Sequence, residues 1–297
     1  MSELYYDKKM LSVSSVRLFV QNPKRALDHW NEVEDWFADR KPLIYGSYVH
    51  AGLEDFIKDS DKALTEIREN EPSLYKKVAK TGANAGKLLL YSEYEQAGHV
   101  LDVLKSSDIV QWIYAKAHDK TGRYATYVEQ PFEGKLNGIG FKGKPDVFVV
   151  DKDKKIIYMF DYKTSSYYDP SGNDWGTDVS GARTYGNVAW HAEKLFPWQA
   201  GAYRELMRQN GFEDYKIDYR YIVATKEKEP RIDIWAIDDQ AMDEGLSAFS
   251  SGLIVSNGYV SGTIEAPLVA DHSPWFNKQT QKQGNLLSVG SAVISDK

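Results

Sequence analysis

The hydrophobic pattern of the chain is clearest near its middle, where two apolar runs flank a charged segment. Residues 147–150 and 156–160 are mainly β-branched and aromatic, and residues 151–155 between them are all charged. Runs of this composition are typical of strands, and a short charged connection is typical of a turn. The pattern therefore predicts a β-hairpin.

The rest of the chain alternates between helical and strand-like spacing. Apolar residues at helical spacing predict helices over residues 11–30, with a break at Asn22-Pro23, and over 44–58, 60–120, 188–210 and 238–255. Apolar and alternating runs predict further strands over residues 124–132, 136–141, 216–225 and 231–237. Helices and strands in this order predict an α/β fold.

The central hairpin carries candidate chemistry. If its turn is centred between Asp153 and Lys154, Asp146 and Asp161 lie opposite each other, with Cβ atoms about 4.5–5.5 Å apart. Since side chains alternate along a strand, Asp161 and Lys163 share one face. Facing carboxylates repel, so a bound metal, the Lys163 ammonium or exposure to water must compensate. Taken alone, the hairpin fits a metal site and a solvated surface hairpin equally well.

Pro145-Asp146, followed by Asp161-Tyr162-Lys163, resembles the signature of the PD-(D/E)XK nucleases. The resemblance implies a restriction-endonuclease-like core, in which helices flank a mixed central sheet, here with added N-terminal helices. It also implies a metal-dependent nuclease. Asp146, Asp161 and Lys163 would be its catalytic residues.

Two further elements resemble the RecB-like and RecE-like branch of these nucleases. Gly46 and His50 match its Gly-x-x-x-His element, and Gln199 and Tyr203 match its Gln-x-x-x-Tyr element. All the pieces occur in the family's order, over residues 44–237. Without the resemblance, His50 would be a packed histidine, and Gln199 and Tyr203 an ordinary polar pair.

The resemblance implies a set of ligands for a divalent metal. His50, Asp146 and Asp161 would bind Mg²⁺, with Mn²⁺ able to substitute, because hard oxygen ligands favour these ions. Lys163 would orient or deprotonate the attacking water, or neutralise charge at the phosphate. Glu129 is a further candidate for the same site. Glu54, one helical turn after His50, either orients the imidazole ring or is exposed.

DNA contacts are expected from four residues. The resemblance places Gln199 and Tyr203 along a DNA cleft, and Thr164 at the end of the hairpin is added to them. Arg183 lies in a segment rich in Gly, Ser and aromatic residues, of the kind that grips a strand by charge and stacking or packs over the sheet.

The resemblance further implies digestion of linear double-stranded DNA from the 5′ end, in phage or prophage recombination. A ring-shaped homo-oligomer enclosing a DNA end and a single-strand annealing protein as partner are expected with it. Two alternatives remain: an endonuclease of restriction or repair type with the same metal site, and a non-catalytic DNA-binding protein that retains the fold.

Length and composition agree with a globular protein. The chain has 297 residues, of which 42% are hydrophobic and 27% charged. We expect one nuclease domain over residues 1–270, with a helical insertion over 60–120 and a catalytic core over 44–58 and 124–237. Residues 271–297 are polar and predict a tail.

Composition also excludes several kinds of site. The chain contains no cysteine, which excludes disulfides, thiolate zinc sites and iron–sulfur clusters. Two glycine-rich stretches, 82–88 and 138–145, lack the following helix or the spacing of a phosphate loop, so no nucleotide cofactor is expected. No run of about 20 apolar residues and no apolar N-terminal core occur, which predicts the cytoplasm of a bacterium or phage-infected host, without membrane contact.

The formal net charge of −6 has the wrong sign for coating nucleic acid. DNA contact must then be local. Six lysines near the central hairpin form a candidate patch: Lys135, Lys142, Lys144, Lys152, Lys154 and Lys155. For the last three, a solvated turn is the alternative.

Overall fold

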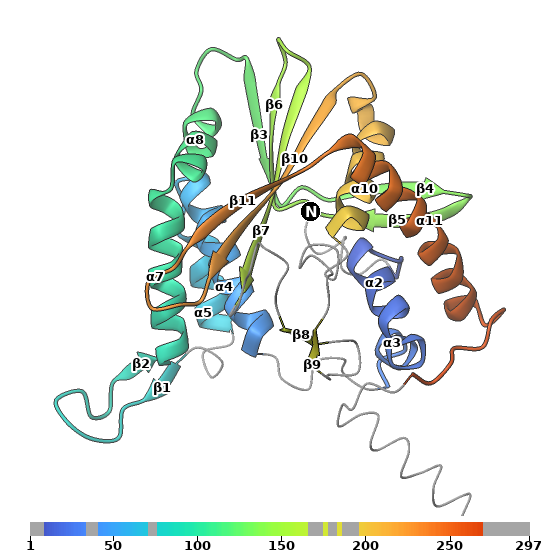
Figure 1. The fold of residues 1–297 in the computed structure, drawn as a ribbon. Helices are drawn as coiled ribbons and strands as arrows, with labels where there is room; N and C mark the ends of the chain where they lie inside the picture. The colour runs from blue at the N-terminus through green and yellow to red at the C-terminus, as the bar shows by residue number, and fades with distance from the viewer. Residues whose placement is uncertain are drawn as a thin grey trace, which may run out of the picture.

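The computed structural model describes residues 9–33, 41–70, 76–165, 175–177, 183–185 and 196–269. Its centre is a five-stranded mixed sheet in the order β11-β10-β7-β6-β3 (Figure 1). These strands are β3 (Tyr124–Val128), β6 (Val147–Asp151), β7 (Ile156–Ser165), β10 (Lys216–Thr225) and β11 (Ile232–Ile237). β10 runs parallel to β7, and the other neighbours are antiparallel. The predicted α/β fold with a mixed central sheet is confirmed.

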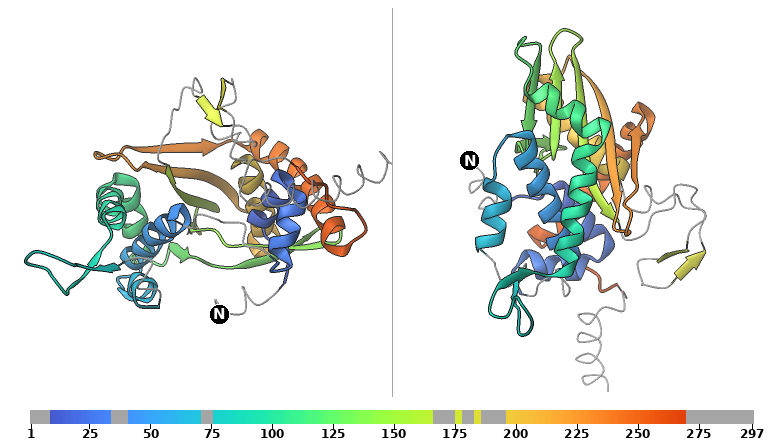
Figure 2. Two further views of the ribbon diagram at one scale, coloured as in Figure 1. Left: turned by 90° about the horizontal axis from the view of Figure 1, so that it is seen from below. Right: turned by 90° about the vertical axis from the view of Figure 1, so that its left-hand side faces the viewer.

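Helices cover both faces of the sheet (Figures 1 and 2). One layer consists of α4 (Lys41–Ile57), α5 (Lys62–Asn70), α7 (Ser92–Ser106) and α8 (Asp108–Ala117). The other consists of α2 (Val13–Gln21), α3 (Pro23–Trp30), α10 (Phe196–Met207) and α11 (Asp239–Ser261). In β7, Phe160 and Tyr162 join the core under the first layer, whereas Ile157 and Met159 join the core under the second. Because strand side chains alternate, one strand serves both cores.

The register of the central hairpin agrees with its prediction. Val147 pairs with Phe160 and Asp151 pairs with Ile156, so the turn is centred between Asp153 and Lys154. Asp146 lies one residue before β6. This pairing places Asp146 and Asp161 at the same end of the two strands.

The N-terminal helices also form as their capping residues predict. Ser12 caps α2, and its hydroxyl accepts a hydrogen bond from the Ser15 backbone N–H at 3.0 Å. Asn22 caps α3 with Pro23 in the first turn, where a missing N–H costs nothing. The predicted break is therefore the junction of two capped helices.

The prediction of one strand over residues 136–141 is wrong. A hairpin forms instead, from β4 (Phe132–Leu136) and β5 (Ile139–Gly143). Asn137 and Gly138 connect its strands with φ angles of 51° and 78°. Two left-handed residues in a row are what a tight two-residue hairpin turn requires, and Asn-Gly adopts them readily.

The region predicted as helical over residues 60–120 also contains a hairpin. β1 (Lys76–Val78) pairs with β2 (Leu88–Leu90) between α5 and α7. Gly82 and Gly86 in its loop both have a φ of 79°, which a continuing helix does not allow. A third two-stranded pair, β8 (Trp175–Thr177) and β9 (Arg183–Tyr185), follows β7.

The candidate lysine patch does not assemble around Asp146. Lys152, Lys154 and Lys155 lie in the β6–β7 turn, at the opposite end of β6 from Asp146. At about 3.3 Å per residue, the five residues of β6 separate the two by roughly 16 Å. Lys142 is only 6% exposed. The turn lysines therefore lie at the other end of the strands from Asp146.

The last two helices, α10 and α11, pack backbone against backbone. A Cβ at Gly201 would lie 2.4 Å from the Met242 carbonyl oxygen, and one at Gly245 would lie 2.0 Å from the Pro197 carbonyl oxygen. No side chain fits at either contact. α10 ends in a π-helical turn, Arg208–Phe212, where Gly211 with φ 91° acts as the predicted stop.

Parts of the sequence-based description lie outside the described residues. Residues 188–195, predicted as the start of a helix, and the predicted tail over 271–297 belong to them. The division into one domain and a tail therefore stays a prediction. Among the helices that the structure describes, none is both long and apolar enough to cross a membrane.

The turn of the central hairpin is tied by a buried ion pair that can be tested. Asp151 is 1% exposed and accepts hydrogen bonds from Arg123 Nε at 3.0 Å and from the Lys154 N–H at 3.1 Å. The Arg123 side chain lowers the pKa of Asp151 to about 2. Because the folded pKa lies below the ordinary value of 3.8, this carboxylate stabilises the fold above about pH 4, and the effect is lost as the pH falls toward 2.

We expect Asp151→Asn to lower the free energy of unfolding by about 2 kcal/mol at pH 7. Urea denaturation at pH 7 and pH 3 measures this, and the difference from the wild type should shrink at pH 3. The control is Asp153→Asn in the same turn, which is 69% exposed and should change stability by less than about 0.5 kcal/mol. Equal effects of the two substitutions would contradict the role of Asp151.

Candidate active site

Asp146 is held in place by the backbones of two neighbouring segments. The Tyr162 N–H of β7 donates to Asp146 Oδ2 at 2.7 Å. The Glu129 N–H, just after β3, donates to the Asp146 carbonyl oxygen at 2.9 Å. These contacts fix the carboxylate at the end of the hairpin, where its second oxygen is available to other groups.

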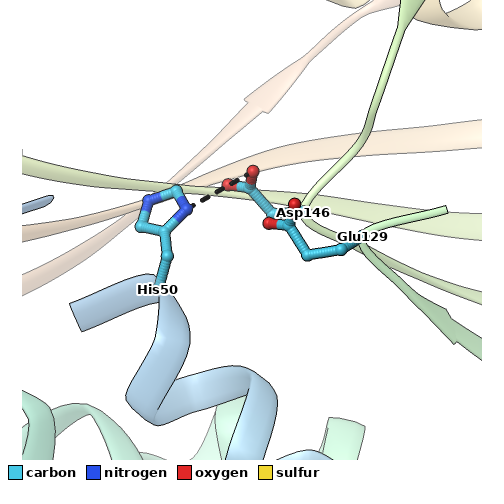
Figure 3. A group of neighbouring side chains, drawn as sticks. All are labelled: His50, Glu129 and Asp146. Atoms are coloured by element: carbon cyan, nitrogen blue, oxygen red, sulfur yellow. Dashed lines mark ion pairs between the residues drawn. The ribbon is translucent and has the colours of Figure 1, made fainter. Parts of the chain in front are cut away.

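His50 projects from α4 toward that second oxygen (Figure 3). Its Nε2 lies 3.0 Å from the Tyr162 carbonyl oxygen, and its Nδ1 lies 3.5 Å from Asp146 Oδ1. A carbonyl only accepts, so Nε2 carries the proton and donates. In the neutral imidazole, the Nδ1 lone pair then faces a carboxylate oxygen. Two acceptors facing each other mark a position for a proton or a cation.

Glu129 completes this group. One atom each of His50, Glu129 and Asp146 lies within 4.8 Å of the others. Glu129 has a left-handed backbone with φ 55°, which turns its side chain toward Asp146 after β3 ends (Figure 3). Burial and the charge of Asp146 raise the pKa of Glu129, and the ion pair with Lys144 opposes that rise.

The three side chains fit a divalent metal. Two carboxylates and a neutral imidazole are donors that Mg²⁺, Mn²⁺ and related ions accept. The 4.8 Å limit leaves room for one ion between them. The candidate metal site is thus His50 and Asp146, as predicted, together with Glu129, which the sequence offered as a further candidate.

Asp161 lies on the neighbouring strand and is engaged differently. Its side chain is 2% exposed, forms an ion pair with Lys163 and accepts hydrogen bonds from Gln199 Nε2 and, at 3.5 Å, from the Tyr219 hydroxyl. Asp161 and Lys163 share one face of β7, as predicted. The Asp161 carboxylate is not part of the three-residue group found among the described residues, so its role as a metal ligand stays a prediction.

Lys163 has an unusual environment for a lysine. Burial lowers its pKa to about 8, the positive charge of Arg17 acts in the same direction, and Asp146 opposes both. The lowered pKa brings the uncharged form of Lys163 closer to neutral pH. Amines with a pKa near the working pH are effective in proton transfer.

Arg17, on α2, is a residue of this neighbourhood that sequence reasoning did not single out. Its Nε is buried and has no hydrogen-bond partner among the described residues. Burial also lowers the pKa of Arg17, while the hydroxyl groups of Tyr221 and Tyr203 act in the opposite direction. A cationic side chain thus faces the region of Lys163 from the second helical layer.

On α10, Gln199 contacts Asp161 and Tyr203 contacts the segment before Asp146. Gln199 accepts from the Tyr221 hydroxyl at 3.4 Å and donates to Asp161, so it orients that carboxylate. Tyr203 is 7% exposed, and its hydroxyl donates to the Lys144 carbonyl oxygen at 3.3 Å. Tyr203 supports the segment before Asp146, because packing of α10 on β5 buries its ring. The expected DNA contacts of Gln199 and Tyr203 stay predictions.

Gly143 permits this packing. A Cβ there would lie 2.6 Å from the Tyr203 ring, so a side chain at this position would push α10 away from the strand. Gly46 has more space, since its Cβ would meet only the Thr164 Oγ1 at 4.0 Å. Thr164 is half-buried near the end of β7.

The remaining predicted residues lie elsewhere. Glu54 pairs with Lys58 at 2.7 Å and does not belong to the three-residue group. Arg183 contributes its backbone to β9, and its side chain lies outside the described part of the chain.

Comparison with known proteins identifies the family. Residues 12–262 match the family described as "PDDEXK-like domain of unknown function (DUF3799)". The chain belongs to this PDDEXK-like family. Membership of the PD-(D/E)XK superfamily, expected from the motifs at Asp146 and Asp161, is thereby confirmed.

A solved structure supports the fold of this PDDEXK-like protein. The crystal structure of a "putative exonuclease" from Eubacterium rectale is similar with a TM-score of 0.67 and 19% sequence identity. The match covers 94% of this chain and 92% of the other. At this identity the likeness shows a shared fold. No curated protein gives a significant match.

Metal binding can be measured apart from any activity. We expect Glu129→Gln to weaken Mn²⁺ binding by about tenfold or more, because it removes a charged ligand and keeps the shape of the side chain. Isothermal titration calorimetry with Mn²⁺ reports the change. Glu54→Gln is the control, since Glu54 pairs with Lys58 and should leave Mn²⁺ affinity unchanged. Equal Mn²⁺ affinity in Glu129→Gln and the wild type would remove Glu129 from the site.

Proposed function

We propose that this PDDEXK-like protein is a metal-dependent deoxyribonuclease that hydrolyses phosphodiester bonds. The observation that carries the proposal is the meeting of His50, Glu129 and Asp146 beside the Asp161–Lys163 pair. A protein that only binds DNA has no need for a metal-ligand set next to a lysine of lowered pKa. This arrangement favours an enzyme over a binding protein.

Each residue has a separate task in the proposed reaction. His50, Glu129 and Asp146 would hold Mg²⁺ or Mn²⁺, and Asp161 is the further predicted ligand. A divalent cation there supplies an acidified water and stabilises negative charge on the phosphate. His50 presents Nδ1 to the site because the Tyr162 carbonyl holds Nε2–H.

Lys163 can act on the attacking water or on the phosphate. Its uncharged form accepts a proton from water, and its ammonium form stabilises charge on the phosphate oxygens. The pKa of about 8 makes both forms accessible near neutral pH. Asp161 and Gln199 hold the amine in place, since Gln199 fixes one Asp161 oxygen while Lys163 pairs with the other.

The finer proposal is an exonuclease that digests linear double-stranded DNA in the 5′-to-3′ direction, as RecE-like enzymes of phage recombination do. It is supported by the ordered motifs of that branch and by the likeness to the Eubacterium rectale protein, which is described as a "putative exonuclease". With this proposal come a ring-shaped homo-oligomer and a single-strand annealing partner. An endonuclease with the same metal site is the alternative.

Substitutions on β7 test the catalytic residues. We expect Lys163→Ala and Asp161→Asn each to lower the cleavage rate by at least about 100-fold. The first removes the amine that acts on the water or the phosphate, and the second removes the charge of the carboxylate that holds this amine and is the further predicted metal ligand. Lys216→Ala, at the exposed start of β10, is the control and should cleave like the wild type. Circular dichroism checks that the fold is kept. Full activity in both β7 variants would defeat the assignment.

Substrate topology separates the exonuclease from the endonuclease. The experiment compares a linear duplex labelled at either the 5′ or the 3′ end with a covalently closed circle, in Mg²⁺ with and without chelator. We expect early release of the 5′ label, no cutting of the circle and complete inhibition by chelator. Rapid cutting of closed circles would favour the endonuclease, and activity in chelator would reject the metal site.

A further inference from the structure

The hairpin of β1 and β2 extends from the helical layer that carries His50. We call residues 76–90 the basic arm. It projects away from the body of the molecule in both Figure 1 and the left view of Figure 2. Val78 is 58% exposed, and residues 80–87 are exposed throughout. The outer part of the basic arm therefore does not pack on the other parts of the chain that the structure describes.

The basic arm is positively charged, whereas the chain as a whole has a net negative charge. It contains lysines at positions 76, 77, 80 and 87 and no acidic residue, whereas the whole chain has a net charge of −6. Lys77, Lys80 and Lys87 are exposed. Such a segment attracts polyanions locally although the protein as a whole repels them.

The base of the basic arm and the candidate active site lie at the same end of the strands of the central sheet. β2 leads directly into α7, where Gln96 Nε2 donates to the Glu227 carbonyl oxygen at 3.1 Å, just beyond the end of β10. β10 is parallel to β7, with Thr225 beside Ser165, so this end is also the end that bears Lys163. The lysines of the β6–β7 turn lie at the opposite end of these strands.

The length of the basic arm sets its reach. The paired part of the arm runs from residue 76 to Ala79, whose N–H donates to the Lys87 carbonyl oxygen, and these four residues correspond to roughly 13 Å of extended strand. Residues 80–86 form the turn at its tip. Phosphates of one DNA strand recur about every 3.4 Å along the helix axis. The paired part of the arm is thus about as long as four base pairs of a duplex.

We propose that the basic arm binds the phosphate backbone of the substrate duplex several base pairs from the cleaved bond, through Lys77, Lys80 and Lys87. This inference rests on the proposed nuclease function and adds a substrate-binding surface to it. The arm would hold DNA without reading its sequence, because lysine ammonium groups contact phosphates and its other residues in the loop are small: Ala79, Thr81, Gly82, Ala83, Asn84, Ala85 and Gly86.

The test compares two triple variants that remove equal charge. In the arm variant, Lys77, Lys80 and Lys87 are replaced by Gln. In the control variant, Lys152, Lys154 and Lys155, at the opposite end of the strands, are replaced by Gln. Binding of a labelled duplex is measured in chelator over a range of salt concentrations, and cleavage is measured in Mg²⁺. Thermal unfolding shows that both variants fold.

We expect the arm variant to bind a duplex of about 20 base pairs roughly tenfold more weakly, with a salt slope lower by about 2 to 3, since each lost phosphate contact contributes about 0.9. KM should rise while kcat stays near the wild-type value, because the arm does not touch the reacting phosphate. A duplex too short to reach the arm should show little difference, and an arm variant with Arg in place of each Lys should bind like the wild type.

The outcomes separate this inference from the proposed function. If the wild type cleaves DNA but the arm and control variants bind it equally well, the basic arm is not a DNA-binding surface. If the wild type neither binds nor cleaves DNA, both proposals fail. A fall in kcat without a change in duplex affinity would also overturn the inference.

Discussion

The pairing of β6 with β7 is the constraint on which the candidate site depends. Because Val147 faces Phe160, the Tyr162 N–H reaches one oxygen of Asp146 and the Tyr162 carbonyl reaches Nε2 of His50. One peptide segment thus orients both a carboxylate and an imidazole. A shift of one residue would turn Asp161 and Lys163 to the other face and bury them among the side chains under α4 and α7.

Charge balance explains how so many ionisable groups meet at the end of a sheet. Asp161 is buried, and Glu129 and Asp146 are largely so, which is costly unless cations lie nearby. Lys163 offsets Asp161 and Lys144 offsets Glu129, while Asp146 is left facing the lone pair of His50. A divalent cation bound between Asp146 and His50 would compensate this charge.

Much of the fold and part of the site could be predicted from the sequence, for physical reasons. The strand over residues 216–225 has a clear alternation of apolar and polar residues. The register of the central hairpin follows from two apolar runs and a short turn. Glu129 could not be assigned firmly, because its direction depends on a left-handed backbone at the end of β3. Arg17 reaches the site only through the packing of α2 on the second layer, which no local pattern encodes. The Asn137-Gly138 turn, by contrast, had a clear local signal.

The contact between α10 and α11 has a consequence for anyone who transplants or redesigns this centre. Gly201 and Gly245 let the two backbones touch, so the position of one helix depends on the position of the other. Gln199 is therefore positioned by two helices that pack on each other, although β10 and β11 separate them in the chain. A graft that carried α10 alone would lose the alignment of that amide, however faithfully its own residues were copied.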